Sequence, residues 1–288
     1  MICKLAIYMI GIFDSGIGGL TVLQEIHKLC PAESTLYFAD QSHIPYGSKS
    51  ETDVQRYSDQ ICQYLITRGA SVIVVACNTA TAAAISWLRH RYPQVPFVGM
   101  EPAIKPAAEQ TKTGRIGVLA TAGTFKSQRY AQLMKRYAHQ VQLFENSCIG
   151  LVEQIESGDL TGDSTDSLLR SFIGPMLDEG IDTLILGCTH YPFALPVIKN
   201  IVGADITIIN PASAVAQQTL RVIEHRRSTS SVLPASHMPM HEFVTSGKLI
   251  EYIPMVKRLN SIINKRSKPG ENPINATHKT FYQKVDNN

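Results

Sequence analysis

The sequence predicts an α/β protein with two pseudo-symmetric α/β domains, each built on a mainly parallel central sheet, and a cleft between them. Three observations predict this fold class. Continuous apolar runs alternate with amphipathic stretches of helical length, which is typical of parallel sheets covered by helices. Motifs of the first half of the chain recur in the second. The composition, 44% hydrophobic and 18% charged over 288 residues, is that of a chain with a real core.

Apolar runs give the expected strands, because a strand of a parallel sheet is buried on both faces. In chain order these runs are Ile7–Phe13, Thr35–Ala39, Val72–Ala76, Phe97–Gly99, Ile116–Ala120, Gln142–Phe144, Thr183–Leu186 and Ile206–Ile209. The stretches between them place apolar residues on one helical face. We expect helices near residues 20–30, 50–68, 80–91, 126–137, 165–179, 192–201 and 212–226.

An internal repeat sets the expected domain boundaries. Ile10–Ser15 resembles Ile116–Thr121, and Val72–Thr79 resembles Thr183–His190. Each copy then closes with a helix and a strand that ends in a proline turn. The helix-rich segment after residue 212 is too short for a third domain and should pack back on the first. The expected division is a first, discontinuous domain of residues 1–101 and 211–266, a second domain of residues 102–210, and a flexible tail of residues 267–288.

Cysteine content and hydropathy limit the class of protein. The cysteines at positions 3, 30, 62, 77, 148 and 188 include no C-x-x-C pair and are too few for a disulfide scaffold. Free thiols fit the reducing cytoplasm. No apolar stretch is long enough to span a membrane, and the apolar segment after Lys4 runs into Asp14 without a signal-peptide cleavage site. We therefore expect a cytoplasmic protein with no membrane partner.

The net charge of +3 is unevenly distributed. Residues 226–288 carry ten Lys and Arg against four Asp and Glu, a net +6, whereas the rest of the chain is net −3. A basic segment can contact nucleic acid, but a solvated helix end followed by a loose tail explains the same charge.

Cys77 and Cys188 occupy equivalent places in the two repeats. Each ends an apolar strand and precedes polar residues, such as Asn78 and Thr189, that can cap a helix. Ligands of open α/β sheets bind beyond the carboxyl ends of the strands. The N–H groups at a helix N-terminus stabilise an anion and lower the pKa of a thiol there. We therefore expect both thiols to face the cleft.

Two opposed thiols suit several chemistries. They can remove a proton from one face of a carbon and return one to the other, as a racemase requires. They can also form a redox pair, ligate a metal together with His190, or supply the nucleophile of a Cys–His pair. A protein that only grips an amino acid between two lobes has no need of two thiols. Gly16–Gly19 matches neither G-x-G-x-x-G nor a P-loop, and no lysine of these motifs could hold pyridoxal phosphate. We therefore expect no cofactor and no metal.

Four blocks of the sequence resemble those of the glutamate racemases, within the aspartate/glutamate racemase superfamily. They follow the family's order: Phe13–Val22, Ala39–Asp40 with Pro45–Ser48, Ala76–Ala80, and Gly187–Pro192. Thr245–Gly247 is similar to a late turn motif of the same family, and the resemblance covers about residues 9–262. It implies a cofactor-independent isomerase that interconverts L- and D-glutamate in the cleft and supplies D-glutamate for peptidoglycan. Aspartate or another acidic amino acid is the alternative substrate.

The resemblance also implies the roles of the catalytic groups. Cys77 would exchange a proton with D-glutamate and Cys188 with the L-isomer, each alternating as acid and base. Asp14 would assist Cys77, and His190 with a glutamate would assist Cys188. This glutamate ends a segment that begins at a cysteine in the family. Here that segment starts at Cys148, without the family's usual proline after it, and its spacing favours Glu156 over Glu153.

The substrate must be held by both of its carboxylates while a carbanion forms beside one of them. Backbone N–H groups and hydroxyls in the four blocks can supply the hydrogen bonds, and Gly47 permits a close approach of the chain to the substrate. The expected substrate-binding residues are Asp14, Ser15, Tyr46, Gly47, Asn78, Thr79, Thr189 and His190. We expect a homodimer or a monomer–dimer equilibrium. Some members of the family bind DNA gyrase, for which the basic segment offers only slight support.

Overall fold

The computed structural model describes residues 9–229 and 239–248 of the chain, and the strands of this part form two separate parallel sheets. The first sheet contains β1 (Met9–Asp14), β2 (Ser34–Ala39), β3 (Ala70–Val75), β4 (Phe97–Gly99) and β9 (His241–Thr245), in the order β4-β3-β1-β2-β9. The second contains β5 (Arg115–Ala120), β6 (Gln142–Asn146), β7 (Thr183–Gly187) and β8 (Thr207–Ile209), in the order β6-β5-β7-β8. This confirms the predicted α/β fold with parallel sheets.

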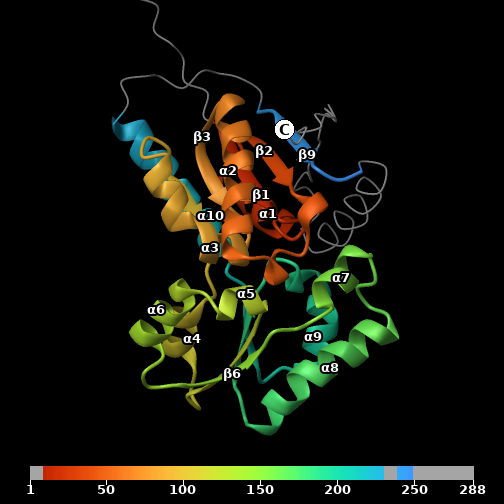
Figure 1. Ribbon diagram of the computed structural model, residues 1–288. Helices are drawn as coiled ribbons and strands as arrows, with labels where there is room; N and C mark the ends of the chain where they lie inside the picture. Colours follow the sequence, from red (N-terminus) through yellow and green to blue (C-terminus); the bar gives the residue numbers. More distant parts are fainter. Residues whose placement is uncertain (1–8, 230–238, 249–288) are drawn as a thin grey trace, which may run out of the picture.

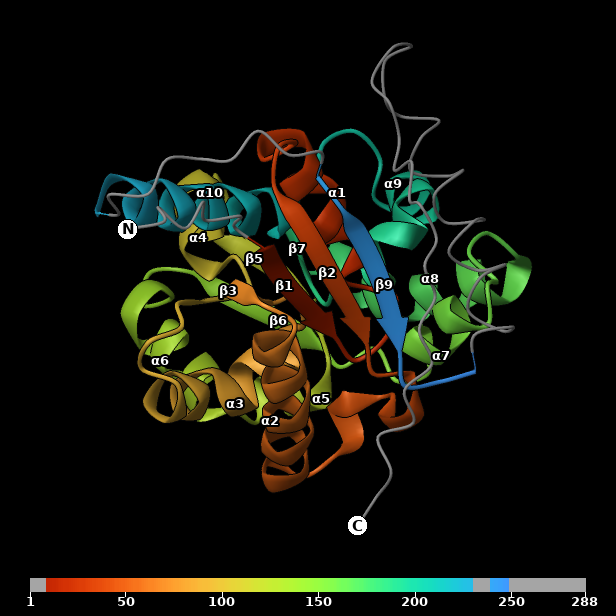
Figure 2. The same ribbon diagram turned by 90° about the horizontal axis from the view of Figure 1, so that it is seen from above.

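Helices cover both faces of each sheet (Figures 1 and 2). Those around the first sheet are α1 (Leu20–Leu29), α2 (Glu51–Thr67), α3 (Asn78–Arg91) and α10 (Ala212–Thr229). Those around the second are α4 (Ile104–Gln110), α5 (Ala122–Phe125), α6 (Gln128–Tyr137), α7 (Leu151–Glu156), α8 (Asp163–Asp178) and α9 (Leu195–Val202). Short 3-10 turns lie at Gln41–His43, Tyr46–Ser48 and Tyr191–Ala194.

Alternation along each strand divides the core into layers, because successive side chains point to opposite faces of a sheet. In β1, Ile10 and Ile12 pack among residues of α1 and α10, whereas Phe13 packs on the face covered by α2 and α3. In β5, Val118 faces α4 and α6, and Leu119 faces the opposite side with residues of α8 and α9. Both faces of each central strand are therefore dry, as the continuous apolar runs predicted.

The carboxyl ends of the strands in one sheet point toward the other half of the molecule. In Figure 1 the arrowheads of β2 and β3 lead down to the turns that meet α5 and α7. The segments that follow the strands, rather than the strands themselves, therefore form the contact between the halves. This arrangement brings the carboxyl ends of the equivalent strands of both repeats to one shared cleft.

Several elements differ from the expected ones. The segment after residue 212 is not only helical: β9 adds a parallel edge strand to β2 at residues 241–245. The short helices α4, α5 and α7 were not expected, because too few residues show a helical period. Helix α9 starts at Leu195 rather than near residue 192, since a 3-10 turn precedes it. The expected tail, 267–288, lies outside the described residues, as do residues 1–8 and 249–266.

A buried threonine fixes the helix that follows the first thiol. The Thr81 hydroxyl donates to the Val75 carbonyl at 3.1 Å and accepts the Met100 N–H at 2.9 Å. Thr81 is 1% exposed and Met100 is fully buried, so water cannot replace either bond. Helix α3 is thereby tied to the ends of β3 and β4.

Replacing Thr81 by valine should lower the free energy of unfolding by about 1–3 kcal/mol, because the Met100 N–H then stays buried without an acceptor. Chemical denaturation measures the change. The Thr81→Ser variant keeps the hydroxyl and should lose much less. Equal stability of the valine variant and the unmodified protein would contradict this role.

Candidate active site

The two thiols lie where the sequence predicted, at equivalent ends of the two sheets. Cys77 lies two residues after the end of β3 and caps α3, and Cys188 directly follows β7. They are buried, with 5% and 6% of their surfaces exposed. Asp14 connects their surroundings, because it accepts the hydroxyl of Thr189, the residue after Cys188, at 3.4 Å.

Cys77 itself caps helix α3. Its sulfur accepts the Ala80 N–H at 3.4 Å, and its thiol donates to Ser15 Oγ at 3.8 Å. The expectation that Asn78 would cap this helix is therefore wrong, since Asn78 is already its first residue. The sulfur is held at the helix N-terminus, where the unpaired N–H groups of a helix accumulate.

The expected lowering of the thiol pKa at this helix is also wrong for Cys77. Burial raises the pKa of Cys77 well above its usual value, and the nearby charge of Asp14 raises it further. The Ala80 N–H and the Ser15 hydroxyl act in the opposite direction but do not compensate. Cys77 is therefore a neutral thiol, because the loss of water outweighs the helix N-terminus.

Asp14 lies at the end of β1, next to Cys77. Its Oδ2 accepts the N–H groups of Gly16 at 3.2 Å and Gly19 at 3.0 Å, and its Oδ1 accepts the Thr189 hydroxyl at 3.4 Å. Burial raises the pKa of Asp14, while the charge of His190 and the two N–H groups lower it. The carboxyl therefore orders the loop before α1 and at the same time faces the second half of the molecule.

On the other side of the cleft, Cys188, His190 and Glu156 form a chain of contacts. Cys188 Sγ lies 3.8 Å from His190 Nδ1, and His190 Nε2 lies 2.6 Å from Glu156 Oε1. Burial alone would lower the pKa of His190. The hydrogen bonds with Cys188 and Glu156 and the negative charge of those groups instead raise its pKa well above the usual value. The imidazole is therefore held as a cation between a sulfur and a carboxylate.

Glu156, rather than Glu153, reaches the cleft. Its Oε1 also accepts the Ile17 N–H at 2.9 Å, from the first half of the molecule. Glycines make this approach possible: a Cβ at Gly16 would lie 2.1 Å from Glu156 Oε1, and one at Gly18 would lie 2.5 Å from His190 Nδ1. The glycine-rich loop thus serves close packing between the halves and not phosphate binding.

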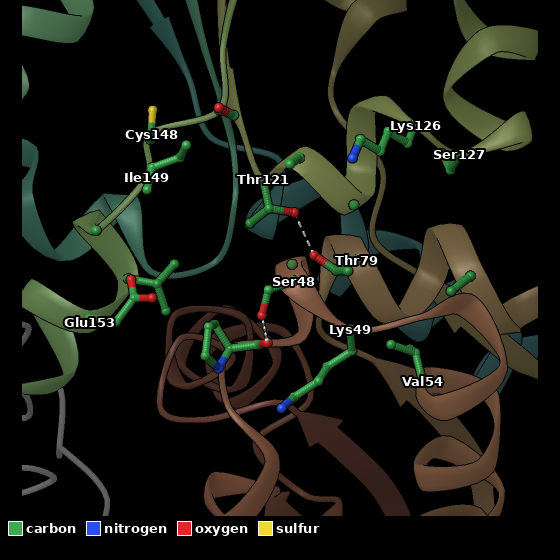
Figure 3. A pocket seen from close by; sticks show the side chains of 18 of the residues that line it. Ser48, Lys49, Val54, Thr79, Thr121, Lys126, Ser127, Cys148, Ile149 and Glu153 are labelled. Carbon is green, nitrogen blue, oxygen red and sulfur yellow. Dashed lines mark hydrogen bonds between the residues drawn. The ribbon is translucent and has the colours of Figure 1, made fainter.

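Asn78 and Thr79, the two residues after Cys77, carry polar groups that suit a ligand. Asn78 is 3% exposed, and neither Nδ2 nor Oδ1 has a hydrogen-bond partner within the protein. Such an orphaned amide is costly to bury and is expected where a ligand completes it. Thr79 Oγ1 meets Thr121 Oγ1 at 2.7 Å across the cleft (Figure 3). Thr121 was not expected at the site, although the repeat aligns it with Ser15.

Tyr46 and Gly47 lie in the 3-10 turn at the edge of the site. The Tyr46 hydroxyl donates to Asp40 Oδ2 at 2.5 Å and is almost fully buried. A Cβ at Gly47 would lie 2.8 Å from the Thr121 Cβ, so this glycine permits close approach to the second half of the protein, and it also lines the cavity. Their expected contact with the substrate stays a prediction. Both residues shape the wall of the site through the turn that they form.

A cavity of about 460 Å³ lies between the two halves, and its lining includes neither Cys77 nor Cys188. The first half supplies one wall with Gly47, Lys49 and Thr79, and the second half supplies the other (Figure 3). Thr79 lies two residues after Cys77 on this wall, and Tyr191 lies three residues after Cys188. Glu153 also lines this outer space, which separates it from Glu156. The cavity is thus the approach to the cleft.

Several alternatives find no support in the described part of the chain. Here no group of three His, Cys, Asp or Glu side chains could hold a metal ion. Cys30, Cys62 and Cys148 are free, buried thiols, while Cys3 lies outside the described residues. Over residues 9–229 and 239–248, no helix has the length and apolar character needed to cross a membrane.

Two halves that each present one buried thiol to a shared cleft define a class of protein that can act on both faces of one small molecule. The chain belongs to the Asp/Glu/Hydantoin racemase family, whose model matches residues 10–219. The glutamate racemase of Pseudomonas paraeruginosa is 53% identical to it over 238 residues, or 83% of this chain and 88% of that protein.

Solved structures of glutamate racemases share the fold. Escherichia coli glutamate racemase, in complex with L-glutamate and the activator UDP-MurNAc-ala, matches with a TM-score of 0.77 at 30% identity, over 90% of this chain and 95% of that chain. Francisella tularensis glutamate racemase, in complex with D-glutamate, matches with a TM-score of 0.76 at 27% identity, over 88% and 93%. These matches confirm the expected family.

Asp14→Asn should make the protein more stable at neutral pH. The pKa of Asp14 is raised in the folded state, so ionisation at pH 7 opposes folding, and the wild type regains stability as the pH falls. The amide keeps an oxygen for Gly19 N–H and an NH₂ group for the Thr189 hydroxyl. Thermal unfolding should give a Tm a few degrees higher for the variant at pH 7, with a smaller gap at pH 5. A lower Tm at pH 7 would show that the carboxylate stabilises the fold.

Proposed function

We propose that this chain is a glutamate racemase, an isomerase that interconverts L- and D-glutamate with Cys77 and Cys188 as its two acid–base groups. The observation that carries the proposal is the pair of buried thiols at equivalent strand ends on opposite sides of one cleft. Its relatives are glutamate racemases, and two of their solved structures hold L- or D-glutamate. Through D-glutamate the enzyme serves peptidoglycan synthesis.

The reaction needs two groups because inversion requires a proton to leave one face of Cα and another to arrive on the opposite face. Cys188, as thiolate, takes the proton from L-glutamate, and Cys77, as thiol, protonates the carbanion to give D-glutamate. In the reverse direction the roles exchange. The neutral state of Cys77 suits its part as the acid in the first direction.

Charged neighbours support each thiol. The positive His190, held by Glu156, stabilises the negative charge on Cys188 and can pass a proton to it. On the other side, Asp14 lies near Cys77 and binds the ammonium group of the substrate, which brings a positive charge toward that thiol. The pairing of a cation with one sulfur and a carboxylate with the other makes the two half-sites chemically different.

The substrate carboxylates occupy the donors that the protein leaves open. The Asn78 amide, unpartnered in the described structure, is the first of these. The hydroxyls of Ser15, Thr79 and Thr189 lie at the same edge, as does the start of helix α3. Stabilising the carboxylate beside Cα lowers the energy of the carbanion, which is the hardest part of the reaction. Thr121 adds a hydroxyl from the second half.

We further propose that the halves are two domains, residues 1–101 with 211–266 and residues 102–210, which close on the substrate. The division of strands between the two sheets supports this boundary. We propose a cytoplasmic enzyme that is a homodimer or in monomer–dimer equilibrium. A nucleic-acid or gyrase contact has only the +6 charge of residues 226–288 in its favour, and most of this segment lies outside the described residues.

The Cys77→Ser and Cys188→Ser variants test the two-thiol mechanism. Each should lose racemisation in both directions by several orders of magnitude, because a hydroxyl is a far weaker acid than a thiol. Polarimetry with L-glutamate, then L-aspartate, and no added cofactor measures this activity. Each variant should still eliminate a leaving group placed beside Cα, since elimination needs only one abstraction. Cys77→Ser should process the L-analogue through Cys188, and Cys188→Ser the D-analogue through Cys77.

The Cys62→Ser variant is the matched control, because this thiol is buried in the first half but lies outside the cleft. It should keep racemisation in both directions. Full activity in either cleft variant, or loss of the same enantiomer in both, would mean that one of the two cysteines is structural.

A further inference from the structure

Gln41 lies between the two halves of the molecule, in the 3-10 turn that follows β2 and Asp40. Its Nε2 donates to Glu156 Oε2 at 3.4 Å, a contact from the first half to the second. A glutamine in a polar turn carries no sequence signal of chemistry. It nevertheless touches the carboxylate that holds His190.

The orientation of the Gln41 amide is fixed from its other side. Thr245 Oγ1, at the end of β9, donates to Gln41 Oε1 at 3.1 Å. Because the hydroxyl donor occupies the carbonyl oxygen, the NH₂ group must point toward Glu156. Gly247 packs directly over this side chain: a Cβ there would lie 2.9 Å from the Gln41 Cβ. The Thr245–Gly247 turn therefore holds the Gln41 amide in one orientation.

The turn is itself held firmly on the first sheet. Ser246 Oγ donates to Asp40 Oδ1 at 2.6 Å and accepts the Ser42 N–H at 3.0 Å. Strand β9 pairs in parallel with β2, from which the Gln41 turn departs. The position of Gln41 therefore follows from the sheet and not from the second half of the molecule.

The Glu156 carboxylate receives three hydrogen bonds, and they have different origins. Ile17 N–H and His190 Nε2 both bind Oε1, at 2.9 and 2.6 Å. Gln41 alone, among the described residues, binds Oε2. Without it the carboxylate could rotate about its last bond and change the face that it offers to the imidazole. A carboxylate that is fixed at both oxygens holds His190 at one angle to Cys188.

We propose that Gln41 is a positioning residue for the Cys188 half of the reaction, acting through Glu156 and His190 and supported by the Thr245–Gly247 turn. This inference rests on the proposed racemase function. It assigns Gln41 to one half-reaction only, because the contacts of Asp14 beside Cys77 come from Gly16, Gly19 and Thr189. Loss of Gln41 should therefore weaken proton abstraction from the L-isomer and spare abstraction from the D-isomer.

Elimination assays in the single-thiol backgrounds separate the two half-reactions. In the Cys77→Ser background, Gln41→Met should slow elimination from the L-analogue by about tenfold, the size expected when a charged group loses one hydrogen bond. In the Cys188→Ser background, the same substitution should change elimination from the D-analogue less than about twofold. Methionine keeps the length of the side chain without a donor, and KM should change less than kcat.

Two further variants show whether the effect of Gln41→Met comes from the lost hydrogen bond or from misfolding. Thr245→Val leaves Gln41 in place but frees its amide, and should reproduce part of the loss in the L-direction. Gln63→Met is the matched control, since this exposed glutamine also donates to a carboxylate, that of Asp59 at 3.1 Å. Both residues lie on α2, outside the cleft. This control should leave both eliminations unchanged.

A pH profile distinguishes positioning from simple packing. Gln41→Glu puts a carboxyl group where the amide donates. Once ionised, that group repels Glu156 and cannot donate, but once protonated it can donate as the amide does. The deficit in L-analogue elimination, relative to the Cys77→Ser parent, should therefore shrink as the pH falls. A deficit that is independent of pH would contradict the donor role.

Equal losses in both backgrounds would overturn the proposal and make Gln41 a general contact between the halves. No loss in either background would overturn it as well. If the single-thiol variants show the complementary eliminations while Gln41→Met has no effect, this inference fails and the proposed function stands. If those parent variants show no such eliminations, the proposed function fails, and this inference falls with it.

Discussion

The carboxylate of Glu156 is the contact on which the arrangement of the cleft depends. It is carried by the second half of the molecule, yet it accepts hydrogen bonds from Ile17 and Gln41 of the first. The same carboxylate holds His190, and His190 touches Cys188. One half-buried carboxyl group therefore couples the approach of the two halves to the surroundings of one thiol. Glycine at Gly16 is needed because any side chain there would displace this carboxylate.

Burial creates a conflict that the site resolves differently on its two sides. A cleft must exclude water to make weak proton transfers possible, but exclusion of water disfavours the thiolate. Around Cys77 no group in the described part of the chain fully offsets the effect of burial, and the pKa of the thiol stays high until a ligand brings charge. Beside Cys188 lies His190, whose pKa is raised well above its usual value, against the effect of burial, by its hydrogen bonds with Cys188 and Glu156. The pseudo-symmetry of the fold thus positions two similar groups, while their neighbours make them unequal.

The sequence predicts the parts of this account that rest on strong local patterns. The strands around Val72–Val75 and Leu184–Leu186 were predictable because burial on both faces requires continuous apolar residues. The repeat then placed both thiols at strand ends. Strand β9 escaped prediction because an edge strand is buried on one side only, and His241–Thr245 reads as a mixed polar segment. Gln41 escaped because its role arises from neighbours that lie far away in the sequence.

The central claim is that two separate groups act on opposite faces of Cα, and the fate of the Cα proton in D₂O tests it most directly. Starting from L-glutamate, early D-glutamate should carry deuterium at Cα, because Cys77 delivers a proton that has exchanged with solvent. The L-glutamate still present should retain protium, because the carbanion is protonated from the Cys77 side before Cys188 exchanges the removed proton with solvent. Early D-glutamate that keeps the original protium would instead mean that a single group carries the proton across, and would contradict the account.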